Sequence, residues 1–163
     1  MKILGIDPGL HICGYAFVES SPQINSGAKL IEAGVLRFTE SSPIEKRLNQ
    51  IADDLDSLLK RLKPDVVAVE QLYSHYKHPR TAILMGHARG VILQKCSQAG
   101  LEVKSFSATR IKKFITGSGR ASKQQMQKSV QTVLQLSVMP HPSDVADAIA
   151  AALCCANSMA IIS

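Results

Sequence analysis

The sequence predicts an α/β fold with a five-stranded mixed sheet, in which three antiparallel strands precede two parallel ones. Two observations lead to this prediction. Three strand-like segments follow one another over short links in the first 38 residues, as in an antiparallel meander. A continuous β-branched run then lies between two helical stretches, which is typical of a buried parallel strand. A chain of 163 residues is long enough for one domain, expected over residues 1–163.

The first strand is expected at residues 2–7, where an apolar run ends in Asp7 and a Pro-Gly pair stops it. The second strand is expected at residues 14–18 and the third at residues 29–38, with a bend at Gly34. Asp7 is thereby placed where a buried strand leaves the sheet, at the edge where ligands gather in α/β folds. For Asp7 alone, a turn aspartate is the alternative.

A helix is expected after Ser42-Pro43, because apolar residues step by three or four and form one stripe of Ile44, Leu48, Ile51, Leu55, Leu58 and Leu62. A proline marks its end, and the β-branched run at residues 65–70 then forms the fourth strand, which ends in Glu70. The next helix is expected at residues 81–99, with Gly100 as its cap and an inward face of Leu84, Ala88, Val91, Ile92 and Cys96.

The rest of the chain is expected to be mainly helical. A fifth strand at residues 101–106 precedes a short basic helix that Ser107 caps. A flexible glycine loop separates this helix from another at residues 122–134. Ser143 is expected to cap the last helix, which runs over residues 144–159.

Positive charge is concentrated in one half of the chain. The formal net charge is +6, yet residues 71–143 contain eleven Lys or Arg and a single acid, Glu102. This asymmetry favours a nucleic-acid partner over a merely solvated face. The four cysteines show no CxxC motif and no paired histidine, which indicates reduced, metal-free thiols and a cytoplasmic protein. We find neither a signal peptide nor an apolar run of about 20 residues, so no membrane segment is expected.

Two further carboxylates, Asp144 and Asp147, are three residues apart at the start of the last helix and therefore share a face. Acids at helix starts can simply stabilise the helix dipole, and this alternative stays open for Asp144. It does not explain Asp147, which enters a helix of small and apolar residues that is expected to be buried. A carboxylate in such a place is costly unless it is paired or bound to a metal.

A divalent metal would account for the acids if Asp7, Glu70, Asp144 and Asp147 converge. Close carboxylates repel one another, and some would hold protons unless cations entered. Ligation by oxygen alone suits Mg²⁺ or Mn²⁺ rather than zinc. Two ions bridged by a shared aspartate could clamp a scissile phosphate, activate water and stabilise the leaving 3′ oxygen. The sequence therefore predicts a metal-dependent nuclease in which these four residues are both metal ligands and catalytic residues.

The whole chain resembles the RuvC family of Holliday junction endonucleases, which have the ribonuclease H-like fold with helices on both faces of the sheet. Gly5-Ile6-Asp7-Pro8-Gly9 resembles the family's first-strand motif, and Glu70-Gln71 resembles its second acidic position. Asp144 and Asp147, followed by an alanine-rich helix, resemble the closing acidic pair. The resemblance implies that the first and fourth strands are neighbours and that their carboxylates face each other.

The resemblance also implies contacts to DNA. Tyr73 matches a position where the family has an aromatic side chain that stacks on bases at the junction centre, although a packing role is the alternative. Lys112 and Lys123 match basic positions near the scissile phosphate. Further candidates for contacts to the DNA backbone are Arg80, Arg89 and Arg120. His141 is expected in a loop near the last acidic pair, where contact with metal or water is an option.

The implied function is the resolution of Holliday junctions in recombination and DNA repair, by paired symmetric nicks in strands of like polarity that leave ligatable 5′-phosphate ends. The implied partners are a four-way DNA junction, homologues of RuvA and RuvB, and a second copy of the chain. The helix at residues 81–99 is the candidate for part of the homodimer interface.

Three alternatives are weighed against this function. An RNA-acting nuclease of the YqgF type shares the opening motif, but Glu70-Gln71 and Tyr73 argue against it. An actin-like or sugar-kinase fold needs two lobes around ATP, and a chain of this length supplies one. A junction-binding protein without catalysis would not need the acids, yet all four are present.

Overall fold

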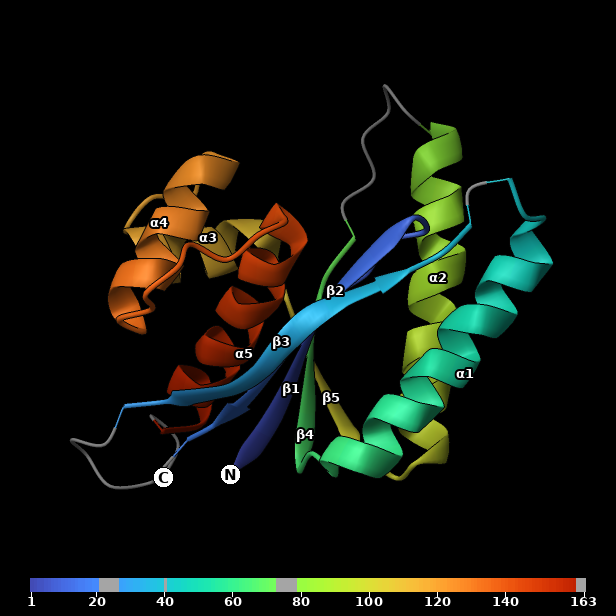
Figure 1. Cartoon of the computed structure of the whole chain (residues 1–163), viewed down its shortest axis with the longest axis horizontal. Helices are drawn as coiled ribbons and strands as arrows, with labels where there is room; N and C mark the ends of the chain where they lie inside the picture. Colours follow the sequence, from blue (N-terminus) through green and yellow to red (C-terminus); the bar gives the residue numbers. More distant parts are fainter. Residues whose placement is uncertain (21–26, 40, 73–78, 161–163) are drawn as a thin grey trace.

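The computed structural model describes residues 1–20, 27–39, 41–72 and 79–160. Within these residues five strands form one mixed sheet: β1 (Lys2–Asp7), β2 (Ile12–Glu19), β3 (Lys29–Arg37), β4 (Val66–Glu70) and β5 (Glu102–Phe106). Their order across the sheet is β3-β2-β1-β4-β5 (Figure 1). β1, β2 and β3 pair antiparallel, whereas β4 runs parallel to both β1 and β5. The mixed sheet expected from the sequence is confirmed.

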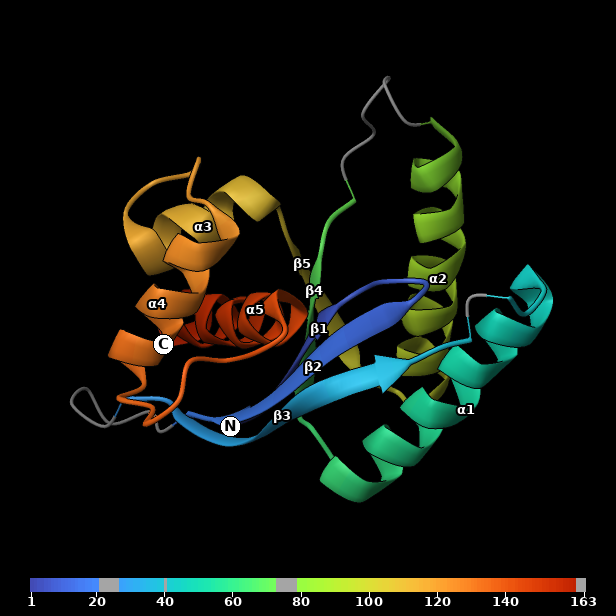
Figure 2. The ribbon, with the colours of Figure 1, turned by 45° about the horizontal axis from the view of Figure 1, so that its top comes forward.

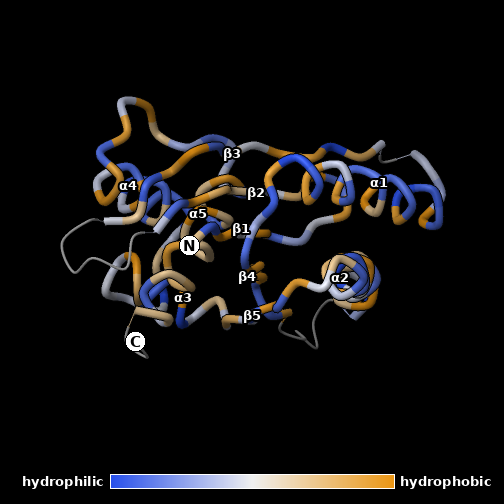
Figure 3. The backbone as a smooth tube through the Cα atoms, turned by 90° about the horizontal axis from the view of Figure 1, so that it is seen from below, coloured by the Kyte–Doolittle hydropathy of each residue, from blue (hydrophilic) through white to orange (hydrophobic). Residues whose placement is uncertain are grey.

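Helices cover both faces of this sheet. α1 (Ile44–Leu62) and α2 (Pro79–Gln98) pack against each other on one side. α3 (Ala108–Thr116), α4 (Lys123–Val133) and α5 (Ser143–Ala160) lie on the other side, where α5 contacts the strands directly (Figures 1 and 2). Figure 3 shows the strands between these two groups of helices. None of the helices in the described part of the chain combines the length and hydropathy that a bilayer span requires.

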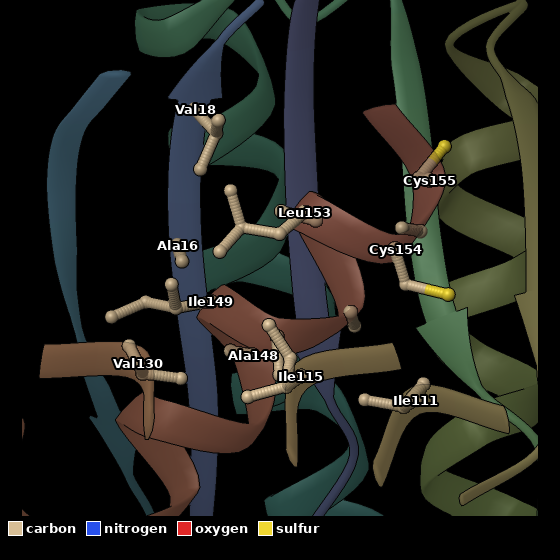
Figure 4. Close-up of a cluster of buried hydrophobic side chains, with 14 of the residues drawn as sticks. Ala16, Val18, Ile111, Ile115, Val130, Ala148, Ile149, Leu153, Cys154 and Cys155 are labelled. Carbon is tan, nitrogen blue, oxygen red and sulfur yellow. The ribbon is translucent and has the colours of Figure 1, made fainter. Parts of the chain in front are cut away.

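Each face of the sheet has its own hydrophobic core, because successive side chains of a strand point to opposite faces. The core under α1 and α2 includes Leu4, Ile6, Ile51, Leu55, Val67, Val69 and Ile92. The core around α5 includes Ile3, Ala16, Val18, Ile111, Val130, Ile149 and Leu153 (Figure 4). Nearly all of these side chains are completely removed from water, so hydrophobic burial fixes both layers of helices on the sheet.

Local signals in the sequence set several helix ends. The Ser107 hydroxyl accepts a hydrogen bond of 3.3 Å from the backbone N–H of Arg110, which confirms the expected cap of α3. Ser122 and Gln125 form a capping box at the start of α4. Beyond the end of α2, Gly100 has a φ of 70°, a left-handed conformation that glycine adopts without strain.

The backbone of α5 lies directly on β1 and β2, and two glycines make this close approach possible. A methyl group at Gly5 would lie 2.1 Å from the carbonyl oxygen of Ala148, and one at Gly14 would lie 2.1 Å from that of Asp144. Neither position therefore has room for a side chain. Ala152 of α5 packs against Gly5 as well, since a methyl group at Gly5 would lie 2.9 Å from it.

Two local features differ from the sequence-based expectation. The irregularity expected at Gly34 lies elsewhere: the pairing of β2 with β3 shifts between Phe17 and Val18, which leaves Ile31 as an extra residue on an edge strand. Gly34 instead faces Tyr15, whose ring occupies the space that a side chain would need. The last helix begins with Ser143 itself, so this serine is the first helical residue rather than the cap.

Replacement of Gly14 by alanine is expected to destabilise the fold, because the added methyl would overlap the Asp144 carbonyl and displace α5. We expect the free energy of unfolding, measured by urea denaturation, to fall by about 2 kcal/mol or more. Gly27→Ala is the matched control: a methyl there meets no atom within 4 Å, and we expect a change below about 0.5 kcal/mol. Equal losses in both variants would contradict the close packing of α5.

Candidate active site

Asp7 and Glu70 come together because they end neighbouring strands. Each is the last residue of its strand, and β1 runs parallel to β4 with Ile6 opposite Val69. Alternation along the strands directs both carboxylates to the face that α5 covers, the face on which Ala68 is buried. This register explains why Asp7 and Glu70 face each other at the carboxyl end of the sheet, as expected from the sequence.

α5 brings two more carboxylates to the same edge. Asp144 lies in its first turn, Asp147 lies one turn later, and both are partly exposed. Gly14 explains this placement. It lies opposite Asp7 in the β1–β2 pair, and the backbone of Asp144 packs directly against it. The hydroxyl of Ser143 donates a long hydrogen bond of 3.5 Å to the Asp144 carboxylate. The start of α5 is thus held beside the end of β1.

All four carboxylates line one cavity of about 470 Å³. They come from β1, β4 and the first two turns of α5. The remaining wall is formed by the turn after β1 and by α2, α3 and α4, and it includes His11, Met85, Lys112, Lys123 and Met126. The four acids and two lysines singled out in the sequence therefore share one cavity.

Burial and mutual repulsion raise the pKa values of three of these carboxyl groups. For Asp7, burial is the largest cause and the three other carboxylates add to it, so its pKa rises from 3.8 to about 8. Burial, followed by repulsion from Asp147, raises the pKa of Glu70 from 4.5 to about 7. The pKa of Asp147 is also raised, mainly by burial. Without cations, this cavity holds protons at neutral pH.

Two lysines on the helical side of the cavity oppose this repulsion. Lys123, the first residue of α4, lowers the pKa values of Asp7 and Asp147. Lys112, on α3, lowers those of Glu70 and Asp147. The lysines therefore reach the acids from two different helices. Their charge also suits an incoming phosphate group.

Comparison with known proteins decides the family. The family model described as "Crossover junction endodeoxyribonuclease RuvC" matches residues 3–155. The chain belongs to the RuvC family. A RuvC of Rhodopirellula baltica is 47% identical over 154 residues, which are 93% of this chain and 84% of that protein.

Solved structures of RuvC proteins agree with this assignment. Thermus thermophilus RuvC in complex with Holliday junction substrate matches with a TM-score of 0.88 at 29% identity, covering 99% of this chain and 96% of that one. The yeast mitochondrial Holliday junction resolvase Ydc2 matches with a TM-score of 0.67 at 15% identity, covering 98% of this chain and 80% of that one, and shares the fold. The expected ribonuclease H-like fold is confirmed.

Membership of the RuvC family implies a divalent metal cofactor, and the cavity offers suitable ligands. Its acidic groups are all carboxylates, whose hard oxygen atoms suit Mg²⁺ and Mn²⁺. Among the described residues, no three His, Cys, Asp or Glu side chains are arranged to hold an ion by themselves. This arrangement still fits Mg²⁺, which usually binds one or two carboxylates and keeps water and substrate phosphate as its other ligands.

Three other residues singled out in the sequence are not part of the cavity wall. Arg80 on α2, Arg120 between α3 and α4, and His141 are exposed. Tyr73 lies outside the described residues. Arg89 is half-buried, and its guanidinium donates hydrogen bonds within the chain, so its contact with the DNA backbone stays a prediction.

Several residues of the wall were not anticipated from the sequence, and His11 and Met85 are the most informative of them. His11 lies in the turn between β1 and β2, four residues after Asp7, and this proximity is the only signal in the sequence that points to it. Met85 comes from α2, which is remote in the sequence from both β1 and α5. Only the fold brings such residues to the same cavity.

The raised pKa of Asp7 predicts a pH-dependent stability in the absence of metal. Between pH 3.8 and about 8 the folded chain keeps a proton on Asp7 that the unfolded chain releases. Stability is therefore expected to fall as the pH rises through this window. Asp7→Asn should reduce the slope, whereas Asp53→Asn on the exposed surface of α1 should retain it.

The measurement is the free energy of unfolding by urea in the presence of EDTA, at pH values from 5 to 8. At pH 8, Asp7→Asn should be more stable than the unchanged chain. Parallel pH profiles for the unchanged chain and both variants would contradict the assignment of this slope to Asp7.

Proposed function

We propose that this chain is a metal-dependent Holliday junction endonuclease and that the acidic cavity is its active site. The observation that supports this best is the gathering of four carboxylates and two lysines around one cavity, in a chain of the RuvC family. Asp7, Glu70, Asp144 and Asp147 are the proposed catalytic and metal-binding residues. Holliday junction resolution in recombination and repair follows from the family.

In the proposed reaction, the four carboxylates bind Mg²⁺, or Mn²⁺ in its place, with two ions in each active site. When bound, such cations would supply an activated water molecule and neutralise charge at the leaving oxygen. The water oxygen bonds to phosphorus, the bond from phosphorus to the 3′ oxygen breaks, and the 3′ oxygen gains a proton as the water loses one, which yields a 5′-phosphate and a 3′-hydroxyl. Lys112 and Lys123 hold the scissile phosphate at the mouth of the acidic cavity, where their charges partly offset those of the acids.

A cationic surface next to the cavity is proposed to bind the DNA arms. Residues 107–134, which form α3, α4 and the loop between them, contain six basic residues and no acid: Arg110, Lys112, Lys113, Arg120, Lys123 and Lys128. Contacts to phosphates need no base sequence and weaken steeply with salt. Arg80 and Tyr73 are further proposed contacts, at and just before the start of α2.

The proposed substrate is a four-way DNA junction, on which two copies of the chain make paired nicks in strands of like polarity. The solved complex of Thermus thermophilus RuvC with such a junction supports this substrate. Two-fold symmetry of the junction suits a homodimer. Cooperation with RuvA and RuvB homologues is proposed from the family. The four buried free cysteines support a reducing compartment, the cytoplasm.

A junction-binding protein without catalysis is the alternative that one experiment can exclude. Asp7→Asn should bind a synthetic four-way junction like the unchanged chain, because the cationic surface is intact. Its cleavage rate in Mg²⁺ should fall by about a thousandfold or more, because metal binding is impaired. Binding is measured by fluorescence anisotropy in EDTA, and cleavage is measured on denaturing gels.

Asp53→Asn is the control for this variant, and a linear duplex of matched sequence is the control for the substrate. We expect cleavage of the junction by the unchanged chain and by Asp53→Asn, dependent on Mg²⁺, and little cleavage of the duplex. Full activity of Asp7→Asn would exclude the proposed mechanism. Absence of any cleavage by the unchanged chain would leave only a binding function.

The outer face of α2 is proposed as part of the homodimer interface. This face displays Ile83, which is 61% exposed, and Gly86 and Gly90, where no atom lies within 4 Å of an added methyl. Small residues and an exposed isoleucine allow a second helix to approach closely.

Ile83→Glu is expected to convert the dimer into a monomer, because a charge would be buried in the interface. Val138→Glu is the control, since Val138 is 74% exposed but lies beyond α4. Sedimentation velocity distinguishes the two states. A dimer that survives Ile83→Glu would place the interface elsewhere.

A further inference from the structure

Arg89 connects α2 to the carboxyl ends of two neighbouring strands. Its Nε donates a hydrogen bond of 3.3 Å to the backbone carbonyl of Glu70, and its Nη2 donates one of 2.9 Å to the hydroxyl of Ser105. Glu70 is the last residue of β4, and Ser105 lies on β5 opposite Val69. One side chain therefore joins a helix to the strand end from which Glu70 enters the cavity.

Both acceptors are neutral, although the guanidinium is charged and half-buried. Partial burial of a charged group is unfavourable unless its donors find partners, so these two bonds are needed to keep Arg89 where it is. The planar fork of the guanidinium suits two acceptors at fixed separation. Arg89 thus fixes the position of the Glu70 carbonyl relative to Ser105.

The same strand end is held from β5 as well. The backbone N–H of Gln71 donates a hydrogen bond of 2.8 Å to the carbonyl of Phe106, and its side-chain amide donates one of 3.5 Å to the carbonyl of Ser105. The carbonyl and the N–H of the peptide group between Glu70 and Gln71 are therefore both hydrogen-bonded, which limits rotation of the Glu70 backbone. Since the backbone sets the direction of the Cα–Cβ bond, these hydrogen bonds also limit where the carboxylate can point.

We propose that Arg89 is a positioning residue of the active site, which fixes the end of β4 so that Glu70 is directed into the acidic cavity. This inference rests on the proposed function, because it assigns Glu70 to metal binding. Arg89 acts through the backbone of Glu70 and not on the substrate. Met85, one turn before Arg89, lines the cavity. Helix α2 therefore forms part of the cavity wall and also holds the end of β4 in place.

Three variants test this role. Arg89→Met removes both hydrogen bonds and retains the length of the side chain. Arg89→Lys retains the charge but cannot reproduce the two-pronged contact. Ser105→Ala removes one acceptor and is the mild variant if the others fold poorly. Arg61→Met is the matched control, because Arg61 is likewise held by two hydrogen bonds, to Glu32, but lies at the end of α1.

Metal binding is measured without DNA, by electron paramagnetic resonance of free Mn²⁺ during a titration. Arg89→Met should weaken Mn²⁺ binding by about 10- to 100-fold, as loss of groups that orient metal ligands does. Arg89→Lys should bind Mn²⁺ almost as weakly as Arg89→Met. The Mn²⁺ affinity of Ser105→Ala should fall less than that of Arg89→Met, and Arg61→Met should bind Mn²⁺ like the unchanged chain. Junction binding in EDTA should be unchanged in all variants.

Hydrogen exchange tests the positioning without any metal. The amide of Gln71 should exchange about tenfold faster in Arg89→Met, because local opening of the β4 end becomes easier. The amide of Ile6 in the neighbouring strand should exchange as in the unchanged chain. This readout remains valid even if the unchanged chain binds no Mn²⁺, an outcome that would refute the proposed function alone.

Three results would overturn the inference. Weaker junction binding with unchanged Mn²⁺ affinity would make Arg89 a DNA contact. Full recovery of Mn²⁺ binding by Arg89→Lys would assign the effect to charge and not to geometry. Unchanged exchange at Gln71 in Arg89→Met would show that the end of β4 is fixed without Arg89.

Discussion

The close contact between the α5 backbone and the strands β1 and β2 determines where the acidic groups of the cavity lie. Gly5 and Gly14 allow main chain to rest on main chain, so the first turn of α5 begins beside the end of β1. A side chain at either glycine would overlap the α5 backbone and push the helix away from the sheet. Asp144 and Asp147 would then move away from the carboxylates that end β1 and β4.

The contact brings together groups that repel one another, so the rest of the fold must hold them in place. Burial and repulsion raise the pKa values of Asp7 and Glu70 to about 8 and about 7, which is unfavourable for a folded chain near neutral pH. Hydrophobic cores on both faces of the sheet offset this cost and include nearly every residue of α5 from Val145 to Ala156. Stability is thus reduced at the cavity where we propose that cations bind, a common compromise at functional sites.

Sequence patterns predicted the elements well, because strand runs, helical stripes and caps depend on residues close in the chain. The four acids could also be singled out, because Asp7 and Glu70 end strands and Asp144 and Asp147 lie in the first two turns of a helix. His11, Met85 and the role of Arg89 could not be found in this way. Arg89 looks like any basic residue of the cationic half, and only the placement of α2 against β4 and β5 shows that its donors are used inside the chain. The importance of Gly14 likewise depends on α5, which begins more than a hundred residues later.

The distribution of charge also explains how a chain with an acidic cavity can bind a polyanion. Asp7, Glu70 and Asp147 are partly buried at the ends of β1 and β4 and the start of α5, whereas most basic residues of α3 and α4 are exposed. A phosphate approaching this surface meets lysines first, and at short range it needs cations between itself and the acids. DNA and divalent ions should therefore bind cooperatively, because each neutralises charge that opposes the other, and the coupling must be equal in both directions.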